Sequence, residues 1–239
     1  KTCAIWESYG PYLYKNEHLV PRYYVVPNSI LVVGESTLVK QLVYSLMLQD
    51  FEPKNTVLVQ GTKINDYDID FLKKFNFIFL VKGSVDQNSI GKLKNYVAQG
   101  GVIAPDIFNE QNSLSNDDIK AIFNKTKGNY TEIVPSEYTN NKVVLDISGE
   151  KGWLVASERF AYFPGWKASF NGNDIDMLSA DNIVSSVYLN GEKGKLVFEY
   201  NPKSYRTGKL ISVIAFIVVL AYFCYFAFIK LKQRWSKSS

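Results

Sequence analysis

The side chains that could act as nucleophiles or as general bases near neutral pH are few in this chain. It has one histidine, His18, and two cysteines, Cys3 and Cys224. A cysteine nucleophile needs a histidine partner, and a serine hydrolase needs a Gly-x-Ser-x-Gly turn with a histidine downstream. No cysteine lies between Cys3 and Cys224, His18 precedes the α/β pattern, and no Gly-x-Ser-x-Gly turn with a downstream histidine occurs. The sequence therefore predicts no catalytic residue and leaves open whether any activity belongs to this chain.

Two further stretches resemble ligand sites only superficially. GESTLVKQ (34–41) follows an apolar run but lacks the spacing of a dinucleotide-binding or a Walker loop. We expect an ordinary strand-to-helix turn there, with Ser36 or Thr37 as the N-cap. DYDID (66–70) alternates three aspartates, but a calcium loop needs further ligands and a glycine in the turn. An acidic loop that leads into a helix dipole explains these acids, so we expect no metal and no cofactor.

Aromatic residues crowd one short stretch, RFAYFPGWKASFNG (159–172). Exposed aromatic rings can stack on sugars, which makes Tyr162 and Trp166, with Arg159 beside them, the candidate ligand-binding residues. The alternation of the stretch also places both rings at core-facing positions, with Pro164-Gly165 as the turn. We favour this second, structural interpretation.

The first part of the chain alternates apolar runs with amphipathic stretches. We predict strands at 30–34, 55–60, 77–83 and 102–105, and helices at 36–49, 68–75, 89–101 and 115–123. Alternation at this spacing is typical of right-handed crossovers in a parallel sheet covered on both faces.

Beyond residue 132 the pattern changes to short alternating segments separated by Gly, Asn and Asp turns. We predict strands at 142–148, 152–160, 166–172, 175–180, 183–191 and 195–202. This spacing is typical of an antiparallel β-sandwich.

One apolar segment, residues 210–229, has no charge over 20 residues. A helix of that length spans about 30 Å, the thickness of the hydrocarbon core. It predicts a transmembrane helix with Tyr205 and Trp235 as interfacial anchors. Cys224 lies within this span and Cys3 lies outside it, so we do not expect them to form a disulfide.

The fold class expected is an α/β Rossmann-like layer (flavodoxin- or amidotransferase-like), then an antiparallel β-sandwich and one C-terminal transmembrane helix. The predicted domains are an extended segment (1–27), the α/β domain (28–131), the β-sandwich (132–203), and the transmembrane helix with a short cytoplasmic tail (204–239).

Flanking charges suggest the orientation of the predicted span. Four basic residues follow it and three precede it, which favours a cytoplasmic C-terminus in the cell membrane. Asn-x-Thr triplets at Asn124 and Asn129 agree with an external N-terminal region and are the predicted glycosylation sites. Because the chain has neither a starting Met nor a signal peptide, we expect a processed product or the tail of a longer protein.

The aromatic stretch and the strands after it carry a family resemblance. GWLVASERFAYFPGWKASFNG (152–172) and VYLNGEKGKLVFEYNPKSYRTGKLIS (187–212), ahead of the apolar helix, resemble the C-terminal end of YfhO-type polytopic membrane proteins. Archaeal membrane proteins related to 6-pyruvoyl-tetrahydropterin synthase look similar there. LVPRYYVV (19–26) is similar to a second signature of the family.

These families lie near the multi-helix membrane glycosyltransferases of the GT-C class. The resemblance implies that this chain is the last external region and final transmembrane helix of such a protein. The family's catalytic carboxylates lie on loops of the helical core, outside this sequence, so no catalytic residue carries over.

The function expected is that of a non-catalytic external module of a glycosyltransferase-like or glycolipid-handling cell-envelope protein. The alternative is a single-pass structural or interaction subunit of another membrane complex. Expected partners are the membrane, other transmembrane helices or subunits, and a glycan or glycolipid. A net charge of +4 with scattered lysines argues against nucleic acid.

Overall fold

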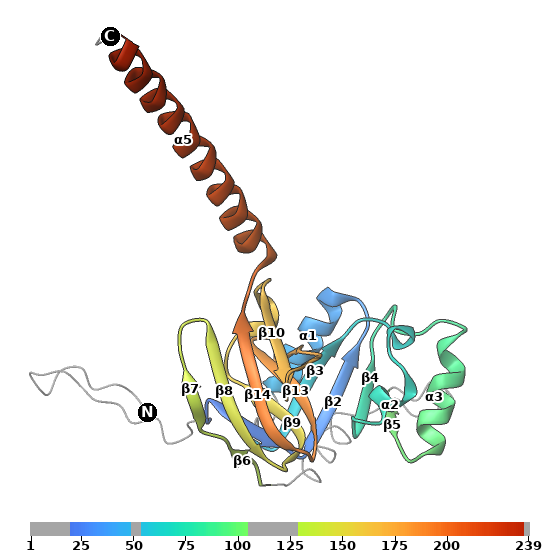
Figure 1. Ribbon diagram of the computed structural model, residues 1–239. Helices are drawn as coiled ribbons and strands as arrows, with labels where there is room; N and C mark the ends of the chain where they lie inside the picture. The colour runs from blue at the N-terminus through green and yellow to red at the C-terminus, as the bar shows by residue number, and fades with distance from the viewer. Residues whose placement is uncertain (1–19, 49–53, 105–128, 237–239) are drawn as a thin grey trace, which may run out of the picture.

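The computed structural model describes residues 20–48, 54–104 and 129–236. Cys3, the helix expected at 115–123 and the sequon at Asn124 lie outside the described residues. The fold is mostly β, with a mixed sheet, an antiparallel sheet and one long C-terminal helix (Figure 1).

The larger sheet has nine strands in the order β5-β4-β2-β3-β12-β13-β9-β1-β6. Its first four strands are parallel, and every later pair is antiparallel. The strands of this sheet are β1 (Tyr23–Val26), β2 (Asn28–Val33), β3 (Thr56–Gly61), β4 (Phe77–Leu80), β5 (Val102–Ala104), β6 (Thr131–Glu132), β9 (Lys151–Ala156), β12 (Leu178–Ala180) and β13 (Val184–Asn190). The four predicted parallel strands are thus confirmed, but their sheet continues into antiparallel strands.

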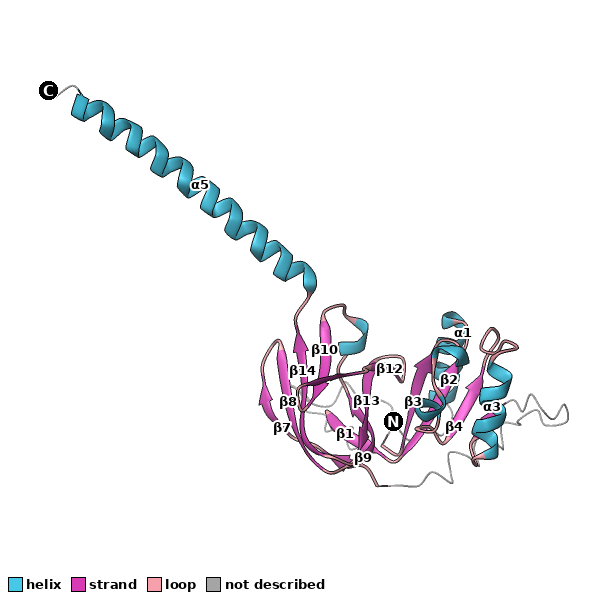
Figure 2. Ribbon diagram, turned by 45° about the vertical axis from the view of Figure 1, so that its right-hand side comes forward, coloured by secondary structure: helices cyan, strands magenta, loops and turns pink. Residues whose placement is uncertain are grey.

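The larger sheet curves back on itself. Only Pro27 separates β1 from β2 in the sequence, whereas four strands lie between them in the sheet. Neighbouring strands are about 4.8 Å apart, so a flat sheet could not satisfy a one-residue link. Tyr24 and Val26 of β1 accordingly share a core with Leu31 and Val33 of β2 on the concave face. Figure 2 shows this curvature.

Among the described residues, three helices cover the parallel strands. On the concave face lie α2 (Ile69–Leu72) and α3 (Ser89–Ala98), which contribute Leu72, Leu93 and Tyr96 to the core. On the convex face lies α1 (Ser36–Met47), whose Val39, Val43 and Leu46 pack on β2, β3 and β4. The sheet is therefore covered on both faces at its parallel end, as the sequence predicts.

The smaller sheet covers the convex face of the antiparallel strands. It has the order β11-β10-β14-β8-β7 and is antiparallel throughout. Its strands are β7 (Pro135–Tyr138), β8 (Lys142–Ser148), β10 (Trp166–Phe170), β11 (Asn173–Ile175) and β14 (Lys193–Tyr200). Buried residues from both sheets, such as Leu154 and Phe198, form one core between them.

The C-terminal helix α5 (Lys203–Ser236) leaves the folded part at the end of β14 (Figure 1). Within its segment Lys203–Phe226, an 18-residue window has a mean hydropathy of 2.3, and the segment is long and apolar enough to cross a membrane. No part of this segment is buried by the described residues.

Local turn chemistry agrees with the sequence at two of three places. Gly100, at φ +91°, ends α3, as glycine commonly does after a helix. Asn171 and Gly172, both at positive φ, form the two-residue turn between β10 and β11. The cap expected at Ser36 or Thr37 is wrong, because α1 begins at Ser36 behind Glu35, which makes no side-chain cap. Glu35 is held instead by its backbone N–H, which donates to Lys82 O at 3.1 Å.

Candidate functional site

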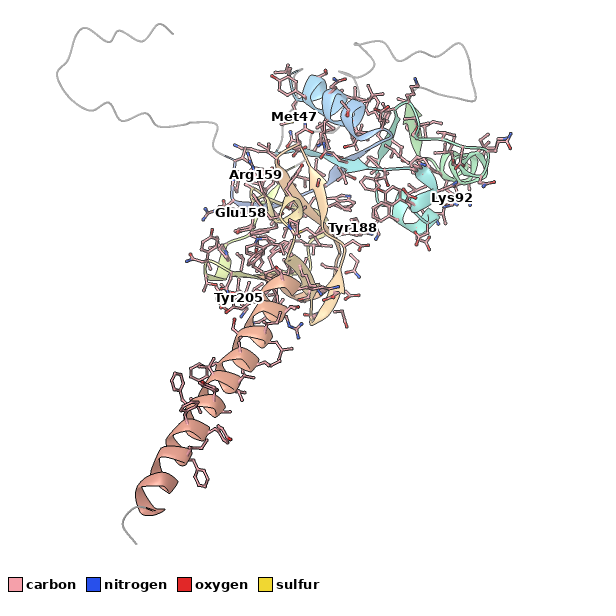
Figure 3. All side chains as sticks on the ribbon, turned by 90° about the horizontal axis from the view of Figure 1, so that it is seen from above. Met47, Lys92, Glu158, Arg159, Tyr188 and Tyr205 are labelled. Carbon is pink, nitrogen blue, oxygen red and sulfur yellow. The ribbon has the colours of Figure 1, made fainter. Side chains whose placement is uncertain are left out.

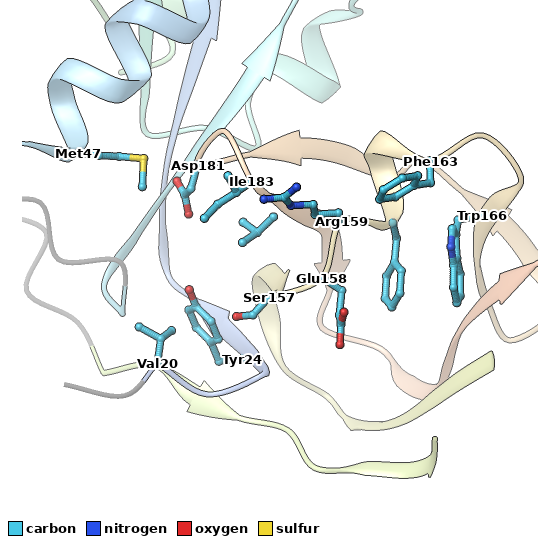
Figure 4. A pocket seen from close by; sticks show the side chains of 12 residues that line it. Val20, Tyr24, Met47, Ser157, Glu158, Arg159, Phe163, Trp166, Asp181 and Ile183 are labelled. Carbon is cyan, nitrogen blue, oxygen red and sulfur yellow. The ribbon is translucent and has the colours of Figure 1, made fainter. Parts of the chain in front are cut away.

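A cleft of about 690 Å³ lies where the C-terminal end of α1, the turn after β12 and the aromatic stretch after β9 meet. Figure 4 shows Trp166 and Phe163 at one end of the cleft and Val20 and Met47 at the other, with Arg159 between them. Met47, Arg159 and Glu158 lie together on one side of the folded part, away from Lys92 (Figure 3). Two of the three candidate residues, Arg159 and Trp166, therefore line one cleft.

The most unusual group in the cleft is the carboxyl group of Asp181. Asp181 is 4% exposed, and its Oδ1 accepts a hydrogen bond from the backbone N–H of Leu58 at 2.8 Å. Burial raises the pKa of this carboxyl from 3.8 to about 7, although the bond from Leu58 lowers it. A carboxyl with such a pKa changes its charge near neutral pH, so it can act there as a hydrogen-bond donor or as an acceptor.

Asp181 is held by the backbone of a tight turn. Asp181 and Asn182 have φ values of +45° and +60°, a conformation that Asp and Asn tolerate better than other non-glycine residues. The Asn182 side chain accepts a hydrogen bond from Gln60 and donates one to Lys40 O at 3.0 Å. The turn thus connects β12 to both β3 and α1, which fixes the floor of the cleft.

The third candidate, Tyr162, contacts Gln60, which also binds Asn182 of the turn at the floor of the cleft. Its hydroxyl donates to Gln60 Oε1 at 3.1 Å. Burial raises the pKa of the Tyr162 phenol, the charge of Asp181 adds to the rise, and that of Arg159 opposes it. Asp181 and Arg159 therefore both lie close enough to Tyr162 to affect its pKa, although Tyr162 does not line the cleft itself.

Arg159 brings an uncompensated positive charge to the cleft. Within the described part of the chain, its guanidinium group makes no ion pair. A guanidinium offers several N–H donors in a plane and binds carboxylates, phosphates and hydroxyl-rich groups. Arg159 is thus available to a ligand from the middle of the cleft.

Glu158, in contrast, is already engaged. Its Oε1 lies 3.0 Å from Arg22 Nε and accepts a hydrogen bond from the Tyr138 hydroxyl at 3.3 Å. Its backbone oxygen accepts a hydrogen bond from Ser185 Oγ at 2.8 Å. Glu158 therefore braces the segment after β9 rather than offering a free carboxylate.

The aromatic corner, which we define as residues 160–166, is partly core and partly surface. Phe160 is the buried ring and packs against the tilted rings of Trp166 and Phe198, with centroids 4.2 and 5.0 Å away. Trp166 is half-buried, and Phe163 is 56% exposed. Phe160 occupies the inner position between the sheets, and the half-buried Trp166 packs against the same core from its edge. The core-facing position expected for Tyr162 needs correction, because its half-buried side chain is not part of a hydrophobic core of the described residues and its hydroxyl donates to Gln60 Oε1.

The three aspartates of DYDID each have a local partner. Asp66 accepts a hydrogen bond from Thr62 Oγ1 at 2.5 Å, and Asp68 caps α2 by accepting one from the Phe71 N–H at 2.6 Å. Asp70 lies 3.1 Å from Lys73. Over residues 20–48, 54–104 and 129–236, no group of three potential metal ligands occurs.

Of the two predicted glycosylation sites, Asn129 is described and exposed. It precedes β6, whose Thr131 is the third residue of the sequon. A modifying enzyme can therefore reach the Asn129 side chain.

No family model, curated protein or solved structure matches this chain.

Sequence reasoning missed Asp181 and Tyr24, which also line the cleft. The Asp181-Asn182 pair between two strands was a turn signal, but its burial depends on β3, more than a hundred residues earlier. Tyr24 lies in β1, within a Tyr- and Pro-rich stretch that has no readable period.

Proposed function

We propose that this chain is a membrane-anchored external module that binds a glycan or the headgroup of a glycolipid in the cleft, without catalysing a reaction there. In this proposal the parallel strands with α1, α2 and α3 form a Rossmann-like layer, and the antiparallel strands form a β-sandwich. The helix α5 spans the cell membrane, with the N-terminal region external and the C-terminus cytoplasmic. The module would serve a glycosyltransferase-like or glycolipid-handling protein of the cell envelope.

The composition of the cleft supports this proposal. Trp166 offers an aromatic face, Arg159 offers planar donors, and Asp181 offers a carboxyl group. Sugar rings present apolar C–H faces and many hydroxyl groups, so an aromatic ring beside polar donors and acceptors is a suitable lining. The observation that carries the proposal is that these three side chains line a single cleft.

The position of the cleft supports a lipid-linked glycan. The corner that supplies Trp166 also packs against the start of α5, because Gly165 lies against Pro202. One end of the cleft is therefore close to the end of the molecule that would meet the bilayer.

The test is binding of short neutral and acidic oligosaccharides to the full chain in lipid nanodiscs, followed by saturation-transfer NMR and calorimetry. We expect Trp166→Ala to weaken binding about tenfold, equivalent to about 1.4 kcal/mol. Arg159→Ala should weaken the binding of acidic sugars more than that of neutral ones. Lys167→Ala is the matched control, because Lys167 is exposed and does not line this cleft. Absence of binding, or binding unchanged in Trp166→Ala, would remove the glycan role.

The second candidate is an interaction subunit of another membrane complex. It is favoured by the exposed aromatic residues of α5, where Tyr222 and Phe226 lie one helical turn apart with centroids at 5.2 Å. Such a face suits packing against other transmembrane helices. A stoichiometric membrane partner that is lost in Tyr222→Leu/Phe226→Leu, together with a cleft that binds no sugar, would support it.

A further inference from the structure

The aromatic corner is locked to the first turn of α5. Gly165 has φ +110°, and a Cβ at this position would lie 2.8 Å from Pro202 Cβ. The Asn201 N–H donates to Gly165 O at 2.8 Å, and Pro202 O accepts from the Tyr205 N–H at 3.2 Å. The corner and the base of the helix therefore hold one position relative to each other.

Large aromatic residues are exposed around this junction. Phe163 at the tip of the corner is 56% exposed, and Tyr200 and Tyr205 are 41% and 67% exposed. Trp166 packs against Tyr200 with centroids 5.6 Å apart and the rings tilted by 47°. Aromatic rings with one apolar and one wet side are enriched at the interface between membrane and water. This junction thus has the composition of a membrane-interface anchor.

Three cations stand on the first turns of α5, at Lys203, Arg206 and Lys209, and all three are exposed. The first turn has no acidic residue, and the cations form no ion pair within the described part of the chain. The N-terminus of a helix is the positive end of its dipole, so cations are disfavoured there. An external anion would offset this repulsion, and the phosphate groups of a lipid headgroup layer supply such anions.

The length of the charged segment at the start of α5 sets how far the aromatic corner lies from the hydrocarbon core. The charge-free run begins at Leu210, seven residues after Lys203, and this corresponds to about 10 Å along a helix. The headgroup layer on each side of a bilayer is about 5–8 Å thick. Arg206 and Lys209 therefore lie within the headgroup layer, and the aromatic corner lies at the outer edge of this layer. The corner comes closer to the headgroups if the helix tilts toward it.

We propose that the aromatic corner, with Lys203, Arg206 and Lys209, binds the anionic headgroup surface of the bilayer that α5 crosses. This inference rests on the proposed function, since it needs α5 in the membrane. The contact is with headgroups and not with the hydrocarbon core. It holds the folded part against the membrane, so that the Trp166 end of the cleft faces the lipid surface.

The experiment places an environment-sensitive fluorophore at single sites of the full chain, with Cys3 and Cys224 changed to serine. Phe163→Cys carries the probe on the corner. Val97→Cys is the matched control, because it is also exposed but lies on α3, far from α5 in Figure 1. Both are reconstituted into nanodiscs of phosphatidylcholine alone, or of equal parts phosphatidylcholine and phosphatidylglycerol, with a headgroup-attached quencher.

We expect the probe on the corner to shift its emission to the blue and to be quenched in the anionic discs, and the control probe to show neither change. The triple variant Lys203→Gln/Arg206→Gln/Lys209→Gln, neutral lipid, or high salt should remove most of the effect, because each weakens the attraction to phosphate. Equal quenching at both sites, or quenching that ignores lipid charge, would overturn the inference.

A separate readout tests the span itself. With Cys3 alone changed to serine, Cys224 should be protected from a membrane-impermeant thiol reagent in the bilayer and should react in detergent. If Cys224 reacts in the bilayer, the proposed function fails as well. If Cys224 is protected while both probes behave alike, only the headgroup contact is wrong.

Discussion

The Asp181 carboxyl group accepts a hydrogen bond from the Leu58 backbone N–H at 2.8 Å, and the Asp181 N–H donates in return to Leu58 O at 2.9 Å. This reciprocal pair joins β3 to the turn after β12, next to the single ladder pair between the two strands, Val59 with Ala180. It thus holds the parallel and antiparallel parts of the large sheet together at their narrowest junction.

The pair makes stability depend on pH. In the unfolded chain Asp181 ionises near pH 4, whereas burial raises its pKa in the folded protein to about 7. Between these values the folded state retains a proton that the unfolded state has lost. The free energy of unfolding therefore falls as the pH rises through this window, by about 1.4 kcal/mol for each unit by which the two pKa values differ. Above about pH 8 it levels off.

We expect Asp181→Asn to remove most of this pH dependence, because an amide keeps the oxygen that accepts from Leu58 and carries no charge. Urea unfolding of the detergent-solubilised chain between pH 4 and pH 8, taken as the difference between variant and wild type, measures it. Asp146→Asn, at an exposed aspartate 3.8 Å from Lys195, is the control. A wild type and an Asp181→Asn variant with parallel pH profiles would contradict the prediction.

Alanine substitutions at Gly165 and Gly172 distinguish the stability cost of backbone strain from the cost of a clash next to α5. Both have positive φ, but a Cβ at Gly172 meets nothing within 4 Å, whereas one at Gly165 meets Pro202 at 2.8 Å. Gly172→Ala should cost about 1 kcal/mol from strain alone. Gly165→Ala should cost about 1–3 kcal/mol more, because the corner or the helix base must move. Thermal or urea unfolding checks this, and equal losses in the two variants would show that the contact is unimportant.

Trp153 is the largest side chain of the concave core and is 1% exposed. Its indole N–H donates to Lys74 O at 3.1 Å, which ties β9 to the segment after α2. Trp153→Phe should cost about 1–3 kcal/mol, because it removes one of the two donors to Lys74 O, the other being Ser29 Oγ, and leaves a smaller ring in the core. Tyr188→Phe keeps the ring that packs 5.4 Å from Trp153 and is the control.

We also expect Trp153→Phe and Tyr188→Phe to unfold in one transition. The concave core includes residues of both the parallel and the antiparallel strands of the large sheet. Far-UV circular dichroism and fluorescence should give coincident curves. Two separated transitions would mean that the two parts are stable independently.

Glycosylation reports which side of the membrane the folded part occupies. In a cell with a eukaryotic secretory pathway, an external Asn129 should be modified. Asn129→Gln and Thr131→Val should then cause the same loss of mass. Both variants should be lighter than the wild type as long as the glycans have not been removed. Asn140→Gln, at an exposed asparagine outside any sequon, should change nothing. An unmodified Asn129 in an inserted protein would argue for the opposite orientation.

Much of the local structure could be predicted because it depends on nearby residues. The strand β8 coincides with the predicted 142–148, where apolar residues alternate between turn signals. The end of α3 and the β10–β11 turn follow from glycines with positive φ. The strand β1 was missed, because it is four residues long and both of its partners, β9 and β6, lie more than a hundred residues later in the sequence.

In the candidate site, too, some features depend on nearby residues and others on residues far apart in the sequence. The local pattern identified Arg159, Tyr162 and Trp166, because aromatic and basic residues around a Pro-Gly turn are visible in the sequence. It could not tell that Phe160 takes the buried position, because which ring reaches the core depends on the distance between two sheets. Nor could it identify Asp181, whose pKa depends on burial by strands from distant parts of the chain.

By itself, the sequence determined the elements whose cause is local: the long apolar helix, the parallel strands and the tight turns. Hydrophobic period, β-branching and glycine conformation act over a few residues and can be read directly. Only the tertiary structure decided how strands were shared between the two sheets, how the larger sheet curved back from β2 to β1, and which side chains met in the cleft. Those outcomes depend on burying apolar faces between segments far apart in sequence, where the free energy belongs to the pairing and not to either segment alone.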